Sequence, residues 1–166
     1  MSRGWWKEHW FKVAFLTFCS GIALAIAWPA FAKSRETGGP WSCPSKFRVL
    51  GRAFAVYQFD NDGRMPLQDW MTATRRYSMT DHCYTCQELR WEKKKFGYAY
   101  NSGIVGADTS AVKDPETTVV LFETEVLAAN LVMNLAGRDS LRHRKITYVS
   151  FLDSHVKRFP AGAPLK

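Results

Sequence analysis

The longest apolar stretch of the chain lies near its N-terminus. No charged side chain occurs between Lys12 and Lys33, and residues 13–32 form a mostly apolar run of 20 residues. As a helix rising about 1.5 Å per residue, this run is roughly 30 Å long, which matches the hydrocarbon thickness of a bilayer. Tryptophans flank it as in the aromatic belts of membrane proteins; these membrane-interface anchors are Trp5, Trp6, Trp10 and Trp28. The pattern predicts a transmembrane helix.

The anchor divides the chain into three expected parts. Residues 1–12 form a cytoplasmic tail, residues 13–32 the anchor, and residues 33–166 a domain on the far side of the membrane. Cleavage as a signal peptide is the alternative, because Ala30-Phe31-Ala32 is similar to a small-x-small cleavage site. We favour an uncleaved anchor, since the apolar run is longer than the usual apolar region of a signal peptide. The charged residues on the two sides of the anchor are nearly balanced, so they do not fix its orientation. We expect the N-terminus on the cytoplasmic side because the N-terminal tail is short.

Beyond the anchor, the spacing of apolar residues predicts one long helix and several strands. Phe47, Leu50, Phe54 and Tyr57 follow the helical period within residues 45–57. Short helices are expected around residues 70–76 and 87–91, and strands at residues 97–101, 117–123, 145–152 and 155–159, the last two forming a hairpin. The apolar segment 125–136 is either a core helix or an exposed contact segment. We expect an α+β domain, with an amphipathic helix packed on a small antiparallel β-sheet.

Composition narrows the classes of protein. The chain has 166 residues, of which 46% are apolar, and a formal net charge of +8. These values exclude a disordered or collagen-like chain and argue against a multi-domain enzyme. The basic residues form clusters, but aromatic residues do not alternate with them as in nucleic-acid-binding modules, so we expect no nucleic-acid partner. More specific partners for these basic clusters are anionic lipid headgroups or an acidic protein surface.

Three cysteines beyond the anchor suggest a disulfide. In an exported domain Cys43 is expected to pair with Cys83 or Cys86, and the connectivity is left open. The alternative is a zinc site, in which His82, Cys83 and Cys86 form half of a zinc knuckle and Cys43 completes it. We favour the disulfide, because a strong zinc motif needs two such cysteine pairs. No metal and no cofactor are therefore expected.

The C-terminal histidines and Asp153 invite comparison with a hydrolase. His143, Asp153 and His155 lie near Ser150 and Ser154 in sequence. However, the chain has no Gly-x-Ser-x-Gly nucleophile elbow, and a nucleophile at a hairpin tip would lack oxyanion donors. Asp153 is more simply the turn residue of the hairpin. We expect no catalytic residues.

Several motifs and their order resemble type IV pilins and type II secretion pseudopilins. The likeness is to the prepilin-like family whose C-terminus has an H-x9-D-G signature: nine residues separate His143 from Asp153, Ser154 replaces the glycine, and His155 follows. Residues 29–36, Ser42-Cys43, residues 57–66, Cys83 or Cys86, and residues 97–101 are similar to the family's helix, post-helix turn and middle region. The resemblance implies a pilin-like fold and a single-pass protein of the bacterial inner membrane, N-terminus inside and C-terminal domain periplasmic.

The processing site of that family is absent. In that family a peptidase cleaves the precursor at a Gly, which is followed by a Phe and by a Glu at the fifth position of the mature chain. Here Gly4 precedes Trp5-Trp6-Lys7-Glu8, which does not match. We therefore expect a non-enzymatic, single-span accessory subunit of a larger respiratory, photosynthetic or secretion complex, in contact with other membrane-protein subunits and the lipid bilayer. The alternatives are a minor pseudopilin of a secretion or pilus machine, and a membrane-tethered metal- or ligand-binding module.

Overall fold

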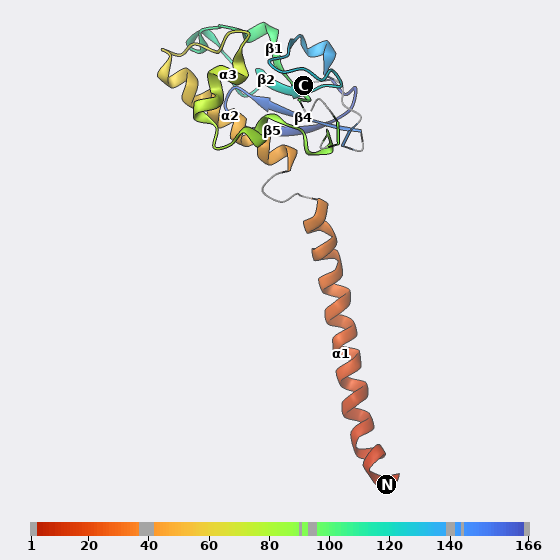
Figure 1. Cartoon of the computed structure of the whole chain (residues 1–166). Coiled ribbons are helices and arrows are strands. Elements are labelled where there is room, and N and C mark those ends of the chain that lie inside the picture. Colours follow the sequence, from red (N-terminus) through yellow and green to blue (C-terminus); the bar gives the residue numbers. More distant parts are fainter. Residues whose placement is uncertain are drawn as a thin grey trace. The chain divides into compact units, whose positions relative to one another are not determined.

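The computed structural model divides the chain into two units, Met1–Gly39 and Pro40–Lys166 (Figure 1). The structure describes residues 3–36, 42–89, 91–92, 96–138, 142–143 and 145–164. Within the first helix it describes the side chains of residues 9, 10 and 12–28.

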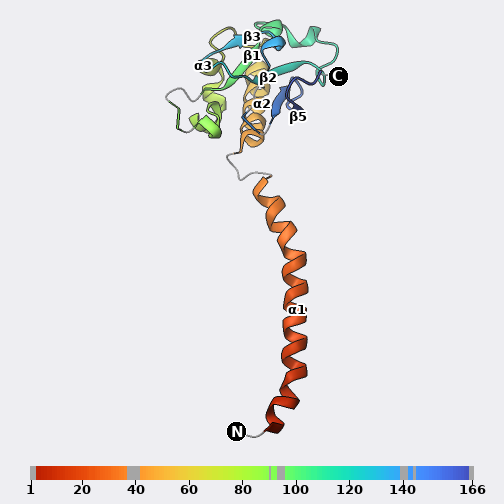
Figure 2. The ribbon, with the colours of Figure 1, turned by 90° about the vertical axis from the view of Figure 1, so that its right-hand side faces the viewer.

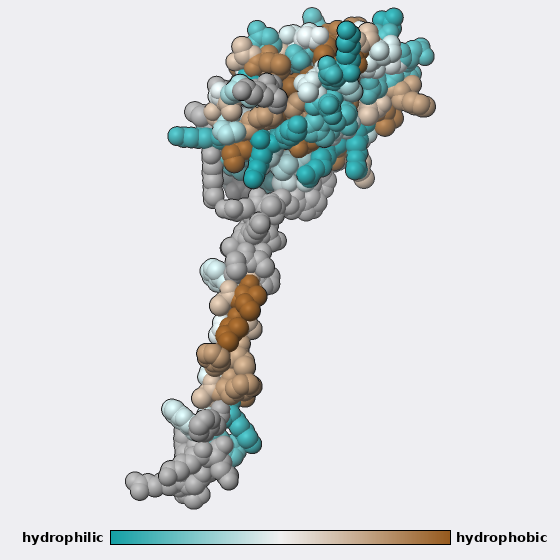
Figure 3. Space-filling view, turned by 180° about the vertical axis from the view of Figure 1, so that it is seen from behind, coloured by the Kyte–Doolittle hydropathy of each residue, from teal (hydrophilic) through white to brown (hydrophobic). Residues whose placement is uncertain are grey.

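The first unit is built on helix α1, Arg3–Glu36, seen from two sides in Figures 1 and 2. In Figure 3 its described part is mostly tan to brown, which marks apolar residues, with a few white or teal polar residues among them. Large apolar side chains there are exposed to between 46% and 78%: Trp10, Val13, Phe15, Leu16, Phe18, Ile22, Leu24, Ile26 and Trp28. Within the first unit, the described residues leave this apolar surface uncovered.

The predicted transmembrane helix is wrong for the part of the chain that the structure describes. No helix there is both long enough and apolar enough to cross a membrane.

The second unit places helix α2, Cys43–Asp60, against a five-stranded sheet of order β3-β1-β2-β4-β5 (Figures 1 and 2). The strands are β1 Tyr98–Asn101, β2 Val119–Glu123, β3 Val132–Met133, β4 Ile146–Phe151 and β5 Val156–Pro160. A short helix, α3, covers Trp70–Thr74. The α+β class is confirmed. The sheet is antiparallel except that β3 pairs in parallel with β1, which corrects the all-antiparallel expectation.

The predicted helical stripe makes the core between α2 and the sheet. Phe47, Leu50 and Phe54 are at most 2% exposed. They pack with the fully buried Tyr98 and Tyr100 of β1 and with Trp70 of α3. Because side chains alternate along a strand, the residues between these face the other side of the sheet. There Ala99, Phe122, Val149 and Phe151 form a second, smaller cluster.

The segment that covers the second face is not a helix. Residues 125–136 contain strand β3 and the start of a 3-10 turn, Leu135–Gly137, so the core-helix alternative is wrong. Leu131, Met133 and Leu135 pack on the second cluster at a spacing of two. Asn130 has φ = 50° and its amide oxygen accepts the Met71 N–H at 2.7 Å, which fixes the entry to the segment. A period of two in a short apolar run indicates an extended chain.

Candidate functional site

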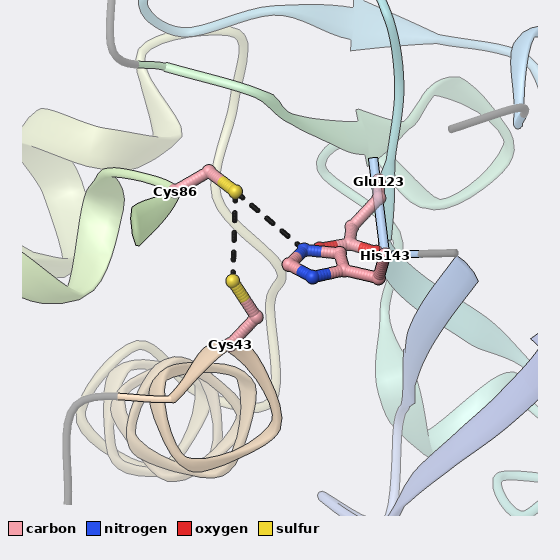
Figure 4. A group of neighbouring side chains, drawn as sticks. All are labelled: Cys43, Cys86, Glu123 and His143. Atoms are coloured by element: carbon pink, nitrogen blue, oxygen red, sulfur yellow. Dashed lines mark hydrogen bonds and ion pairs between the residues drawn. The ribbon is translucent and has the colours of Figure 1, made fainter. Parts of the chain in front are cut away.

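Four chemically reactive side chains from distant parts of the sequence meet inside the second unit (Figure 4). They are Cys43, Cys86, Glu123 and His143, called here the thiol–imidazole cluster. One candidate ligand atom from each residue lies within 4.8 Å of all the others. The two sulfurs are 3.5 Å apart, the Cys86 sulfur is 3.6 Å from His143 Nε2, and that nitrogen is 3.0 Å from Glu123 Oε1.

Local structure explains how each residue reaches the cluster. Cys43 is the first residue of α2, which begins here because Ser42 is extended and Pro44 fits the first turn. Cys86 lies between two short 3-10 turns, Asp81–Tyr84 and Gln87–Leu89. Glu123 ends β2, on the face that Leu121 also presents to α2.

The cluster is nearly sealed from solvent. Cys43 is 3%, Cys86 1% and Glu123 0% exposed, while the His143 side chain is 15% exposed. His143 therefore forms the side nearest to water. The described surface pocket beside Met71 and Tyr84 is lined by no member of the cluster. The arrangement can hold a small ion or form a thiol–thiol bond.

Neighbouring groups hold three of the four side chains in place. Glu123 Oε2 accepts the backbone N–H of Tyr148 at 3.0 Å. The Tyr98 hydroxyl donates to the Cys43 sulfur at 3.5 Å. Arg142, whose side chain is 8% exposed, donates to the carbonyls of Gly97 and Thr124 at 2.8 Å each, and thereby fixes the loop that presents His143.

The thiols and the imidazole are electrostatically coupled. The hydrogen bond between the thiols and the burial of both raise the pKa of Cys43, whereas accepting that bond lowers the pKa of Cys86 against the effect of burial. Burial opposes the charged form of His143, but the Cys43 thiol and the Glu123 carboxylate raise its pKa to about 10. The two pKa shifts have opposite directions, so they favour a thiolate at Cys86 over one at Cys43.

The structure distinguishes between Cys83 and Cys86, the two partners that the sequence allowed for Cys43. Cys83 does not belong to the cluster, since its thiol donates to the carbonyl of Thr80 at 2.9 Å. All four cysteines of the chain are free thiols here. The spacing of Cys43 and Cys86 selects them over Cys83 as the pair able to form a bond, and the disulfide itself stays a prediction. His82 is exposed, so the alternative zinc site built with His82 and Cys83 does not form.

The C-terminal motif residues are split between two places. His143 lies in the cluster, whereas Asp153 and His155 lie in the β4–β5 turn, where Asp153 accepts hydrogen bonds from the His155 backbone and ring. Ser154, at φ = 70°, donates its hydroxyl to the Gly51 carbonyl at 3.1 Å. The Ser150 side chain is fully buried. These residues do not assemble into a serine-hydrolase arrangement.

Glu123 is the member of the cluster that sequence reasoning missed. It closes an otherwise apolar, β-branched run, Val119–Phe122, and a single carboxylate at the end of a buried strand is the signal that could have indicated it. His143 was singled out through the family signature and in the rejected comparison with a hydrolase. Among the tryptophans, Trp10 and Trp28 are 67% and 78% exposed, while the side chains of Trp5 and Trp6 lie outside the described part of the chain.

In comparisons with known proteins, no protein-family model, no curated protein and no solved structure matches this chain.

Proposed function

We propose that this protein is a non-enzymatic structural subunit of a larger protein assembly, in which apolar helices of neighbouring subunits cover α1. The observation behind the proposal is the exposure of nine large apolar side chains on that helix. A helix that is apolar on all sides is stable only when it is buried.

The apolar side chains of α1 point in all directions around its axis. At about 100° per residue, Val13, Phe15, Leu16 and Phe18 already lie on four different sides, and Leu24 and Ile26 repeat two of them. One partner helix covers only one stripe of such a surface. Several neighbours are needed, which favours an assembly over a simple pair.

Burial of this surface supplies a large driving force. Covering a Val, Leu, Ile or Phe side chain contributes about 1.5–3 kcal/mol. Covering half of the nine exposed side chains therefore stabilises the assembly by roughly 10 kcal/mol. Small residues let a partner backbone approach, since a Cβ added at Gly21 would meet nothing within 4 Å and Ser20, Ala23, Ala25 and Ala27 lie nearby.

The second unit supports a structural role. Its helix-on-sheet body with a terminal hairpin has the order of elements expected from the resemblance to pseudopilins, in which such a body follows a long N-terminal helix. Its most reactive group of side chains is enclosed, and Ser154 uses its hydroxyl to fasten the hairpin to α2. We therefore propose that this unit positions partners by shape rather than transforming a substrate.

A photo-crosslinking experiment in cells that make the protein tests the proposal. A photoreactive amino acid replaces Leu24 on α1 or, as the matched control, Met79, which is 91% exposed on the second unit. We expect protein adducts from position 24 that map by mass spectrometry to an apolar helix of another subunit, and none of this kind from position 79. Adducts to lipid only, or no adduct at position 24, would overturn the proposal.

A pair of substitutions supplies an independent readout. Leu24→Lys is expected to shrink the complex on a native gel, because it places a charge in the covered surface, whereas Met79→Lys leaves its size unchanged. Equal behaviour of the two variants contradicts a role for α1 in assembly.

A further inference from the structure

We infer that Cys43, Cys86, Glu123 and His143 together bind one zinc ion, or a closely similar divalent transition metal, as a closed structural site. The inference is independent of the proposed assembly role. It depends on the distances within the cluster, on the full burial of the Glu123 carboxylate and on the kind of donor atoms present.

The distances match the edges of a zinc-centred tetrahedron. With Zn–S near 2.3 Å, Zn–N near 2.05 Å and Zn–O near 2.1 Å, tetrahedral geometry requires about 3.8 Å between two sulfurs, about 3.5 Å between S and N, and about 3.4 Å between N and O. The corresponding distances here are 3.5 Å, 3.6 Å and 3.0 Å. Each of these three agrees within about 0.4 Å. The other three pairs of ligand atoms lie within 4.8 Å of each other, so binding a metal ion would draw the four side chains closer together.

A buried carboxylate oxygen points into the cluster. Glu123 is fully buried, and its Oε1 forms an ion pair with His143 Nε2 at 3.0 Å without a well-aligned hydrogen bond. Its other oxygen is fixed by the Tyr148 backbone N–H. Burying an ion pair is costly, because both charges lose their hydration. A metal ion at the centre of the cluster would bind both Oε1 and the imidazole and offset that cost.

The donor atoms select the class of metal. Two thiolates, one imidazole and one carboxylate suit zinc, whereas calcium and magnesium prefer sites made of oxygen atoms. Four protein ligands leave no open position, which is typical of structural rather than catalytic zinc. Two thiolates and one carboxylate around a divalent ion leave one net negative charge on the site.

The groups around the ligands have the roles expected of a metal site's surroundings. The Tyr98 hydroxyl donates to the Cys43 sulfur, and the Tyr148 N–H orients the Glu123 carboxylate. Such outer contacts set ligand orientation and typically change metal affinity 10–100-fold when they are removed. The metal ion would join the start of α2, the loop at Cys86, the end of β2 and the loop before β4.

Metal analysis of the full-length, tag-free chain purified under reducing conditions tests the inference. We expect about one zinc per chain in the wild type. Cys86→Ser should lose it, and the matched control Cys83→Ser should retain it, because Cys83 is equally buried but lies outside the cluster. A wild type without bound metal after incubation with zinc, or equal metal loss in both variants, overturns the inference. The inference is also overturned if the reduced protein binds no metal and a Cys43–Cys86 disulfide forms once the reductant is removed.

Two further measurements keep the test decisive if Cys86→Ser fails to fold. X-ray absorption of the zinc-loaded wild type should show two sulfurs at about 2.3 Å and two nitrogen or oxygen atoms at about 2.0–2.2 Å. Cobalt titration should give the spectrum of tetrahedral, thiolate-bound cobalt, with an affinity about tenfold lower in Tyr98→Phe. Octahedral cobalt, or a zinc shell without sulfur, contradicts the assignment.

Discussion

Replacing Gly51 by valine should weaken the contact between α2 and the β4–β5 hairpin. A Cβ placed at Gly51 would lie 3.1 Å from Ser150 Oγ and 3.3 Å from the backbone Cα of Ser154. The Ser154 hydroxyl also donates to the Gly51 carbonyl, so the hairpin tip has little freedom to move away. Valine brings two further methyl groups into this contact, which forces the helix and the hairpin apart.

The expected cost follows from three contributions. Overpacking costs about 1–3 kcal/mol, and loss of the Ser154 hydrogen bond costs about 0.5–1.5 kcal/mol. Valine regains about 0.4 kcal/mol, because it has a better helix propensity than glycine. The net destabilisation of the contact is about 2.5 kcal/mol, which corresponds to about 70-fold faster amide exchange where the hairpin opens from α2.

Hydrogen–deuterium exchange of the full-length chain measures this change locally. Peptides that cover Cys43–Asp60 and Ile146–Pro160 should lose protection in Gly51→Val. Arg52→Val is the matched control, since Arg52 is exposed on the same helix and the substitution costs only about 0.5 kcal/mol of helix propensity. If Gly51→Val exchanges as slowly as Arg52→Val, the close packing at Gly51 does not stabilise the second unit and our reasoning is wrong.

Three other changes probe the rest of the second unit. Trp70→Ala should lower the free energy of unfolding by about 3–5 kcal/mol in urea titration, since Trp70 is fully buried; Met79→Ala, at a side chain 91% exposed, should leave it unchanged. Arg142→Lys should cost about 1.5–3 kcal/mol in the same assay, because one ammonium cannot reproduce both carbonyl contacts, and an unchanged midpoint would contradict this role. Although partial burial opposes it, hydrogen bonds from His155 lower the pKa of Asp153. Asp153 therefore contributes stability above its unfolded pKa, near 3.9, that is lost as the pH falls through its lower folded pKa, so acid unfolding of Asp153→Asn should have a shallower pH dependence.

The secondary structure of the second unit could be predicted from the sequence because it depends on local periodicity. Phe47, Leu50 and Phe54 recur at helical spacing, and they form the buried stripe of α2. The β-branched run ending at Phe122 becomes β2, and Asp153-Ser154 forms the hairpin turn. Prediction failed at residues 125–136, since a short apolar run fits a helix or a strand equally well until its partner surface is known. The parallel pairing of β3 with β1 also depends on that partner surface.

The thiol–imidazole cluster could not be assembled from the sequence. Spacing drew attention to His82, Cys83 and Cys86, because a Cys-x-x-Cys motif is a local signal. The folded chain instead brings Cys86 to Cys43, Glu123 and His143, which are separated by 37 to 57 residues from it. Apart from residues 125–136, sequence alone determined which long segments of the second unit are helical or extended and which of their faces are apolar, since these follow from short-range spacing. Only the tertiary structure decided which reactive side chains share one buried volume, because that depends on how helix, loop and sheet pack together across long stretches of chain.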